Sequence, residues 1–95
     1  MKIRYRARAL SDLSDIYQYL EPRSPTGARN VLRAIHAAIG NIGQHPYGAE
    51  QTSEPDIRVK ILGRYRYKIF YSMIETDVVE IIHIRHAARR PWAGE

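Results

Sequence analysis

Lysine and arginine side chains are the groups with the clearest chemical potential in this sequence. Guanidinium and ammonium groups bind phosphate and carboxylate oxygens, so a surface that gathers them can hold nucleic acid or an acidic protein segment. The C-terminal half offers cations on its predicted strands and just after them: Arg58, Lys60, Arg66, Lys68, Arg85 and Arg89. What they can do depends on whether the fold brings them onto one face.

His83 is the histidine best placed for acid–base chemistry, because it neighbours Arg85 in the last predicted strand. His86 follows three residues later and points to the opposite face, so the two histidines cannot form one metal site. The chain has no cysteine and no glycine-rich phosphate loop. We therefore expect neither a metal ion nor a cofactor.

Carboxylates give little support to a catalytic interpretation. Asp12 and Asp15 lie on the polar flank of the first predicted helix, where early acidic residues favour the helix dipole. Glu80 lies on the last predicted strand without an obvious acidic neighbour. The sequence therefore places no carboxylate convincingly beside His83.

The N-terminal half predicts a short strand over residues 2–6 and then two helices. One face of the first helix, which runs from Ala9 to Pro22, carries Leu10, Leu13, Ile16, Tyr17 and Leu20. Ser24 and Pro25 start the second helix as its N-cap and first residue. The apolar stripe of that helix is Ala28, Val31, Leu32, Ile35, Ile39 and Ile42. Two adjacent amphipathic helices predict a helical hairpin.

The C-terminal half changes to a period of two after a polar loop at residues 49–56. Three strands are predicted, over 57–62, 66–73 and 78–86. The element order is then β-α-α-β-β-β, an α+β fold with the helical hairpin packed on an antiparallel sheet. We expect residues 1–95 to form a single domain, since a second core would need roughly 50 more residues.

Alternation also predicts how the first two of these strands pair. Opposed residues of an antiparallel pair share a face, so Ile61 is expected opposite Tyr67 across the connection 63–65. The cations of these strands then share the opposite face: Arg58, Lys60, Arg66 and Lys68. A solvated sheet face without a ligand is the alternative to a binding surface.

The last strand is expected to follow a two-residue turn at Thr76 and Asp77. The predicted neighbours are Ile82 with Tyr71, Ile84 with Ile69, Arg85 with Lys68, and His83 with Phe70. The other register would bury His83 and Arg85, which the cost of desolvation disfavours. Tyr67, Tyr71 and Tyr17 belong to apolar patterns and are expected in the core.

The charge balance favours an anionic partner. Fifteen Lys and Arg against ten Asp and Glu give a net charge of +5, and twelve of the fifteen cations are Arg. No apolar run follows the basic start, and no stretch approaches the ~18 apolar residues of a membrane span. We expect a cytoplasmic protein that has no membrane partner.

Several segments, in their order along the chain, resemble a known family. They are Ala9-x-x-Asp12-Leu13-x-x-Ile16-x-x-Tyr19-Leu20, Ser24-Pro25-x-x-Ala28, Pro46-x-Gly48, Ile57-Arg58, Tyr67-Lys68-Ile69-Phe70-Tyr71 and Val79-Glu80-Ile81-Ile82-His83-Ile84-Arg85-His86-x-x-Arg89. Together they resemble the RelE/ParE superfamily of bacterial type II toxin–antitoxin toxins, and more closely its ParE branch, over nearly the whole chain. Ala7 departs from the pattern, since relatives often have a Ser or Thr helix cap there.

The resemblance implies one of two activities. ParE-like members poison DNA gyrase by trapping it on cleaved DNA, which needs no catalytic residues, and the His86-x-x-Arg89 ending favours this branch. RelE-like members are ribosome-dependent endoribonucleases that cleave mRNA. In that case the catalytic candidates are His83 as base or acid and the cations Lys60, Lys68, Arg66 and Arg89. No tyrosine follows Tyr71, so the ribonuclease apparatus looks incomplete.

We therefore expect a toxin that arrests growth by inhibiting gyrase and acts by binding rather than as an enzyme. A RelE-like endoribonuclease and a non-toxic nucleic-acid-binding module are the alternatives. The resemblance also implies a small cognate antitoxin encoded by the adjacent gene, and the positive charge suits an acidic one. The residues expected to bind the target or the antitoxin are Arg58, Lys60, Arg66, Lys68, Arg85 and Arg89.

Overall fold

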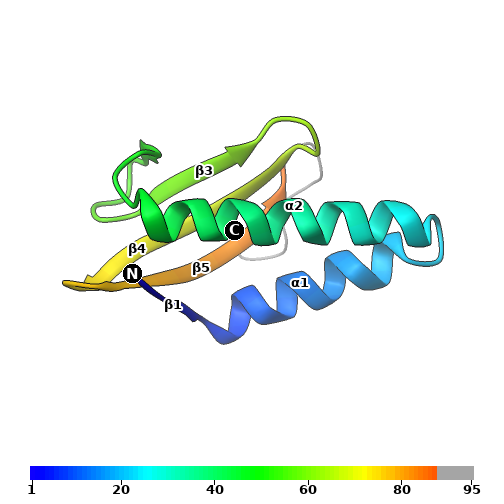
Figure 1. Cartoon of the computed structure of the whole chain (residues 1–95), viewed down its shortest axis with the longest axis horizontal. Helices are drawn as coiled ribbons and strands as arrows, with labels where there is room; N and C mark the ends of the chain where they lie inside the picture. The colour runs from blue at the N-terminus through cyan, green and yellow to red at the C-terminus, as the bar shows by residue number, and fades with distance from the viewer. Residues whose placement is uncertain (88–95) are drawn as a thin grey trace.

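A computed structural model of the chain describes residues 1–87, in which two helices pack against a five-stranded sheet (Figure 1). The elements are β1 (Lys2–Tyr5), α1 (Ala7–Leu20), α2 (Pro25–Gln44), β2 (Glu50–Gln51), β3 (Arg58–Leu62), β4 (Tyr67–Glu75) and β5 (Val78–His86). The strand order is β1-β5-β4-β3-β2. β1 runs parallel to β5 and the other pairs are antiparallel, so the sheet is mixed. The predicted α+β fold is confirmed, and the short strand β2 is added within the predicted polar loop.

The helical hairpin forms where the sequence predicts it. The backbone N–H of Gly27 donates to the Ser24 hydroxyl oxygen at 3.0 Å, and Pro25 is the first residue of α2. α1 begins at Ala7 without a side-chain cap and ends at Leu20, just before Pro22. Figure 1 shows the two helices lying side by side and running in opposite directions.

The core lies between α2 and the middle of the sheet. Ile35, Ile39 and Ile42 of α2 are almost fully buried, as the predicted stripe requires. They share one core cluster with Tyr67, Ile69 and Tyr71 of β4 and with Ile81 and Ile84 of β5. Tyr67 and Tyr71 are therefore core residues, as predicted. The Tyr71 hydroxyl donates to the Pro46 carbonyl oxygen at 2.6 Å, which ties the loop after α2 to the sheet.

The buried face of α1 differs from the predicted one. Leu10 and Tyr17 are 54% and 46% exposed, whereas Ala9, Asp12 and Ile16 are buried. The reason is that α1 turns a small residue and a carboxylate toward β5, where Asp12 accepts a backbone hydrogen bond from Ile84. The prediction that Tyr17 is a core residue is wrong.

The predicted pairing of β3 with β4 is wrong by one residue. Leu62 lies opposite Tyr67, and Ile61 lies opposite Lys68. The connection has four residues rather than three, because Arg66 adopts a left-handed φ of 63° and its N–H donates to the Leu62 carbonyl oxygen at 2.7 Å. A slip of one residue exchanges the two faces of a strand. Ile61 is consequently 51% exposed, while Arg58 and Lys60 lie on the face that carries Tyr71 and Ile69.

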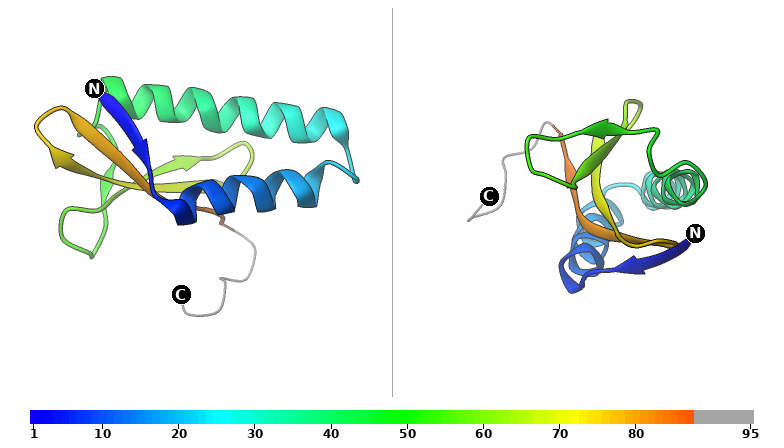
Figure 2. Two further views of the ribbon diagram at one scale, coloured as in Figure 1. Left: turned by 90° about the horizontal axis from the view of Figure 1, so that it is seen from below. Right: turned by 90° about the vertical axis from the view of Figure 1, so that its left-hand side faces the viewer.

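The predicted pairing of β4 with β5 is confirmed over most of its length. Lys68 lies opposite Arg85, Ile69 opposite Ile84, and Phe70 opposite His83, and the turn at Thr76 and Asp77 has two residues. A register shift between Phe70 and Tyr71 places Ile81, not Ile82, opposite Tyr71. This irregularity resembles a β-bulge, which adds one residue to a strand and increases its twist. The twist is visible where the strands are viewed nearly end-on (Figure 2).

Candidate functional site

The sheet face opposite the helices is the first candidate surface, and we call it the outer face. It is made by side chains of β3, β4 and β5: Val59, Ile61, Lys68, Phe70, His83 and Arg85. The rings of Phe70 and His83 stack with centroids 5.5 Å apart and planes at 15°. The Arg85 guanidinium carbon lies 5.8 Å from the Phe70 centroid. The outer face thus combines an aromatic pair with two neighbouring cations, Lys68 and Arg85.

The structure brings only some of the predicted cations together. Arg58 leaves the outer face entirely, since its guanidinium donates to the Ala49 carbonyl oxygen at 2.8 Å and lies 5.2 Å from the Tyr47 centroid. Lys60 lies opposite Ile69 and therefore also lies on the sheet face that packs against the helices. Arg66 lies in the turn between β3 and β4 and is exposed. Arg89 lies outside the described residues. The predicted cationic face is therefore reduced to Lys68 and Arg85.

Asp12 is the residue that sequence reasoning missed. One of its carboxylate oxygens, Oδ2, accepts from the backbone N–H of Ile84 and lies 2.9 Å from Nδ1 of His83. The expectation that no carboxylate lies beside His83 is wrong. The available signal was the spacing of Ala9, Asp12 and Ile16, which share a helix face as positions three and four apart do. The larger apolar residues of the neighbouring stripe masked it.

The Asp12–His83 pair is buried. The exposed fractions of the two side chains are 5% and 12%, and the Nε2 atom of His83 is buried as well. A general base must reach the proton that it removes, directly or through one water. His83 instead contacts Asp12 and stacks on Phe70. The Asp12–His83 pair therefore holds the His83 ring in place on the outer face and connects that face to α1.

The pairing pattern explains why a carboxylate is needed there. β1 pairs with β5 only from Val78 to Ile81, and the Arg6 N–H then donates to the Ile81 carbonyl oxygen. Beyond this point, no strand of residues 1–87 pairs with β5 on that side. Asp12 supplies the acceptor that a longer β1 would have supplied to Ile84. Arg6 also forms an ion pair with Glu80 at 2.9 Å. This ion pair connects the residue that precedes α1 to β5.

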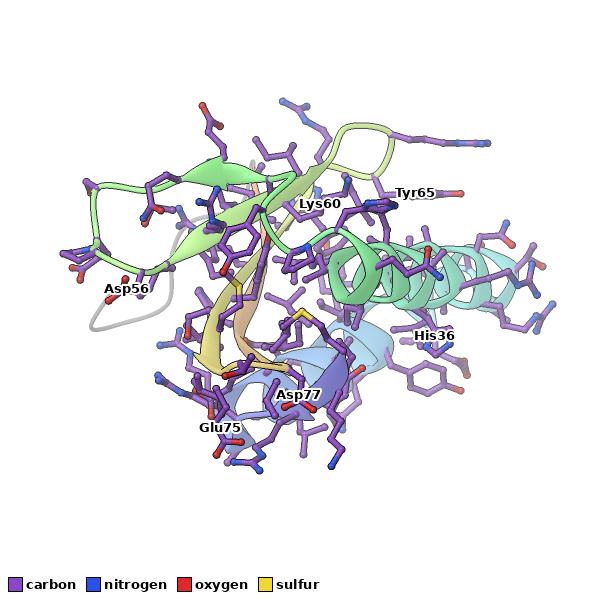
Figure 3. All side chains as sticks on the ribbon, turned by 60° about the vertical axis from the view of Figure 1, so that its left-hand side comes forward. His36, Asp56, Lys60, Tyr65, Glu75 and Asp77 are labelled. Carbon is purple, nitrogen blue, oxygen red and sulfur yellow. The ribbon has the colours of Figure 1, made fainter. Side chains whose placement is uncertain are left out.

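In the described part of the chain, two grooves flank α2. The turn groove lies between α2 and the β3–β4 turn, encloses about 560 Å³, and is lined by Asn30, Arg33, Ala34, Ala37, Leu62, Gly63, Arg64 and Tyr65. The hairpin groove lies between α1 and α2, encloses about 390 Å³, and is lined by Tyr5, Leu13, Ser14, Tyr17, Leu32, Ile35, His36 and Ile39. Figure 3 shows Tyr65 and His36 on opposite sides of α2. The grooves are therefore separate surfaces.

Among residues 1–87, no group of three or more His, Asp or Glu side chains is placed to hold a metal ion. In the same part of the chain, no helix has the length and apolar character to cross a membrane.

Comparison with known proteins places this fold and sequence in a family. The sequence profile of the family described as "ParE toxin of type II toxin-antitoxin system, parDE" matches residues 3–91. The chain belongs to this family. It is thus a toxin of the type II toxin–antitoxin class. A comparison with curated protein sequences gives no match.

Solved structures agree on the fold of this ParE-family chain. A chain of the chromosomal ParDE toxin–antitoxin system from P. aeruginosa superposes with a TM-score of 0.79 at 20% identity, covering 90% of this chain and 95% of that one. The isolated E. coli RelE toxin gives 0.64 at 17% identity, covering 94% and 86%. The E. coli RelBE toxin–antitoxin complex gives 0.64 at 18% identity, covering 93% and 98%.

Proposed function

We propose that this ParE-family toxin arrests growth by inhibiting DNA gyrase in the cytoplasm, and that a cognate acidic antitoxin neutralises it. The observation that carries the proposal is the match of the ParE family over residues 3–91. Two of the structures similar in fold come from a ParDE system and from a RelBE toxin–antitoxin complex. The net charge of +5 suits an acidic partner.

The geometry of the outer face favours inhibition by binding over catalysis. His83 lies on that face, and its ring is buried against Asp12 and Phe70. Lys68 and Arg85 lie on the same face and contribute positive charge rather than proton transfer. A cationic surface of this kind can bind an anionic region of a target without changing it chemically.

A ribosome-dependent endoribonuclease is the second candidate, because cations stand beside a carboxylate–histidine pair. Lys68 and Arg85 could stabilise a phosphorane if the ring of His83 moved into reach of a 2′-OH. This activity requires His83 to leave the packed position between Asp12 and Phe70. The two candidates therefore predict different consequences for the same residue.

Expression under a titratable promoter tests the toxin itself, and two assays on the purified chain identify the target. Inhibition of DNA supercoiling by gyrase, with accumulation of cleaved DNA, is the expected result. Cleavage of mRNA on ribosomes with gyrase unaffected would replace this proposal by the second candidate. A chain that leaves growth, gyrase and mRNA unchanged would instead be a binding module or a degenerate toxin.

His83→Phe separates the candidates within one experiment. Phenylalanine can keep the stack on Phe70 but cannot transfer a proton or pair with Asp12. A gyrase inhibitor should keep its inhibitory activity in any folded fraction of this variant. A ribonuclease that uses His83 should lose cleavage by 100-fold or more, on the order of what general acid–base catalysis supplies.

A further inference from the structure

A small pocket lies where the segment that follows α2 meets β3 and β4, and we call it the loop pocket. It encloses about 190 Å³ and is lined by five side chains: Tyr47, Gln51, Asp56, Arg58 and Met73. Figure 3 shows Asp56 in the loop before β3, away from His36 and from the turn that carries Tyr65. The loop pocket shares no lining residue with the outer face or with the two grooves beside α2.

Opposite charges line the loop pocket without neutralising each other. The Asp56 carboxylate has no hydrogen bond and no ion pair with any residue from 1 to 87. The Arg58 guanidinium donates to the Ala49 carbonyl oxygen at 2.8 Å and keeps other N–H groups for a ligand. Within the described part of the chain, no ion pair joins Asp56 to Arg58. A ligand that donates to the carboxylate and accepts from the guanidinium would satisfy both groups.

Side-chain hydrogen bonds fix the loop that carries Asp56. The Gln51 side-chain amide donates to the carbonyl oxygens of Glu54 and Ile57, each at 3.1 Å. The Thr52 hydroxyl donates to the same Ile57 oxygen at 2.8 Å. Asp56 itself has a left-handed φ of 66°, which is uncommon for a residue with a side chain. The loop therefore holds the backbone from which the carboxylate reaches the pocket.

Tyr47 gives the loop pocket an aromatic surface on which a flat ligand can stack. Its side chain is 69% exposed. The guanidinium carbon of Arg58 lies 5.2 Å from the Tyr47 centroid, whereas Arg23 lies 3.9 Å from the Tyr19 centroid. Arg58 therefore covers its ring less fully than Arg23 does, and part of the Tyr47 face is open to a second planar group. Nucleic-acid bases stack on exposed aromatic side chains in this way.

Size and hydrogen-bonding pattern favour one base. Pockets for drug-sized ligands enclose about 300–1,000 Å³, so a pocket of about 190 Å³ suits a single ring system. Guanine has two adjacent donors on its Watson–Crick edge, N1 and N2, which one carboxylate can accept as a bidentate pair. Its O6 and N7 atoms accept from arginine. Adenine, cytosine and uracil each have one donor group on that edge, so they satisfy Asp56 less completely.

We propose that the loop pocket binds a guanine base, supplied by a nucleotide or by an unpaired guanine of single-stranded nucleic acid. The base stacks on Tyr47, donates to Asp56 and accepts from Arg58. Met73 supplies the apolar part of the lining, and the ribose and phosphate remain outside. The inference is independent of the proposed function, because inhibition of gyrase was assigned to the outer face.

Titration of the purified full chain with GMP and with AMP, followed by amide NMR spectra, tests this site. GMP should cause saturable shifts at residues 47–58 and at Met73. It should also bind about tenfold or more tightly than AMP, since a bidentate contact to a base edge discriminates by that order.

A charge-matched pair of variants tests the carboxylate. Asp56→Asn keeps the size of the side chain and tolerates a left-handed φ, but it cannot accept two N–H groups as a carboxylate does. Its affinity for GMP should fall to that for AMP. Glu54→Gln removes the same charge from the same loop, outside the pocket lining, and should keep the preference for GMP. Thermal unfolding of both variants shows that the fold is retained.

The stacking surface is tested by a second pair of variants. Tyr47→Ala should weaken binding of both nucleotides about fivefold or more, because the base loses its aromatic contact. Tyr47→Phe keeps the ring and should bind GMP more tightly than Tyr47→Ala.

An oligothymidine that contains one guanine distinguishes the two sources of the base. A Kd equal to that of GMP would assign the pocket to the mononucleotide. Tighter binding that weakens with salt would assign it to single-stranded nucleic acid, whose neighbouring phosphates then contribute.

Three results would overturn the inference. Equal affinities for GMP and AMP, or a preference that survives in Asp56→Asn, would show that the pocket does not read guanine. Shifts confined to Lys68 and Arg85 would place the nucleotide on the outer face. The absence of saturable shifts with millimolar GMP and with the oligonucleotide would reject the site, whatever the gyrase assay gives.

Discussion

The Asp12 carboxylate lies 2.9 Å from the backbone nitrogen of Ile84, 72 residues further along the chain. The same oxygen lies 2.9 Å from Nδ1 of His83. One buried side chain of α1 therefore completes the hydrogen bonding of β5 where β1 has ended, and also orients the ring that supports Phe70 on the outer face. The N-terminal helix is thus connected directly to the candidate binding surface.

Replacing Asp12 should reveal how much the pair stabilises the fold. Asp12→Ala leaves the buried Ile84 N–H without its acceptor, and we expect the free energy of unfolding to fall by about 2–3 kcal/mol. Asp12→Asn keeps an acceptor oxygen of the same size and should cost less. Urea titrations of the two variants measure the difference. An equal loss of unfolding free energy in Asp12→Asn and Asp12→Ala would show that the acceptor oxygen for the Ile84 N–H does not stabilise the fold.

The two glycines near the end of α2 offer a matched pair for a second prediction. Gly40→Ala should raise the free energy of unfolding by about 0.5–1 kcal/mol, because alanine favours the helix and meets no neighbour. In Gly43→Ala the new Cβ would lie 3.1 Å from Cδ1 of Ile3 in a buried position. Overpacking should then offset the gain, leaving this variant about 1 kcal/mol or more less stable than Gly40→Ala. Thermal unfolding under identical conditions checks the order, and the reverse order would refute the packing argument.

The helices and the core of β4 were predictable because their signals are local. Ser24 and Pro25 mark the start of α2, and the period of its isoleucines marks its buried face. Tyr67, Ile69 and Tyr71 recur with a period of two along β4, and this period marks its buried face. In each case a single segment carries both the pattern and its consequence.

The candidate site was less predictable, because it depends on how segments meet. The faces of β3 are decided by the left-handed φ of Arg66, which lengthens the turn by one residue and moves Arg58 and Lys60 inward. A positive φ is uncommon for a residue with a side chain, so the sequence gives no warning of it. Asp12 was misplaced for a related reason, since its partner is a backbone N–H exposed only because β1 is short.

Tyr71 predicts a response to alkaline pH. Burial raises the pKa of its hydroxyl above the usual 10.0, although the nearby Arg58 opposes this. The folded state therefore holds this proton more tightly than the unfolded state, and its contribution to stability is complete below pH 10.0 and lost as pH rises above it. Tyr71→Phe should weaken that loss while costing about 1 kcal/mol at neutral pH, because the hydrogen bond to Pro46 is removed. Burial also raises the pKa of Tyr5, so a smaller alkaline loss should persist in this variant.

Lys68 and Arg85 should be needed for inhibition but not for stability. They lie directly opposite each other on β4 and β5, where like charges are destabilising by roughly 0.2–1 kcal/mol. Lys68→Gln/Arg85→Gln should therefore leave the free energy of unfolding unchanged or slightly higher. The concentration of toxin that half-inhibits gyrase supercoiling should rise about tenfold or more, since the variant loses the cations of the outer face.

The control for this last variant is Lys2→Gln/Arg4→Gln, which removes the same charge from the exposed β1. It should inhibit gyrase like the unchanged chain, apart from a small loss of long-range attraction at low salt. A side chain retained against its own electrostatic cost is best explained by what it binds. Full inhibition by a folded Lys68→Gln/Arg85→Gln variant would show instead that these cations only solvate the sheet.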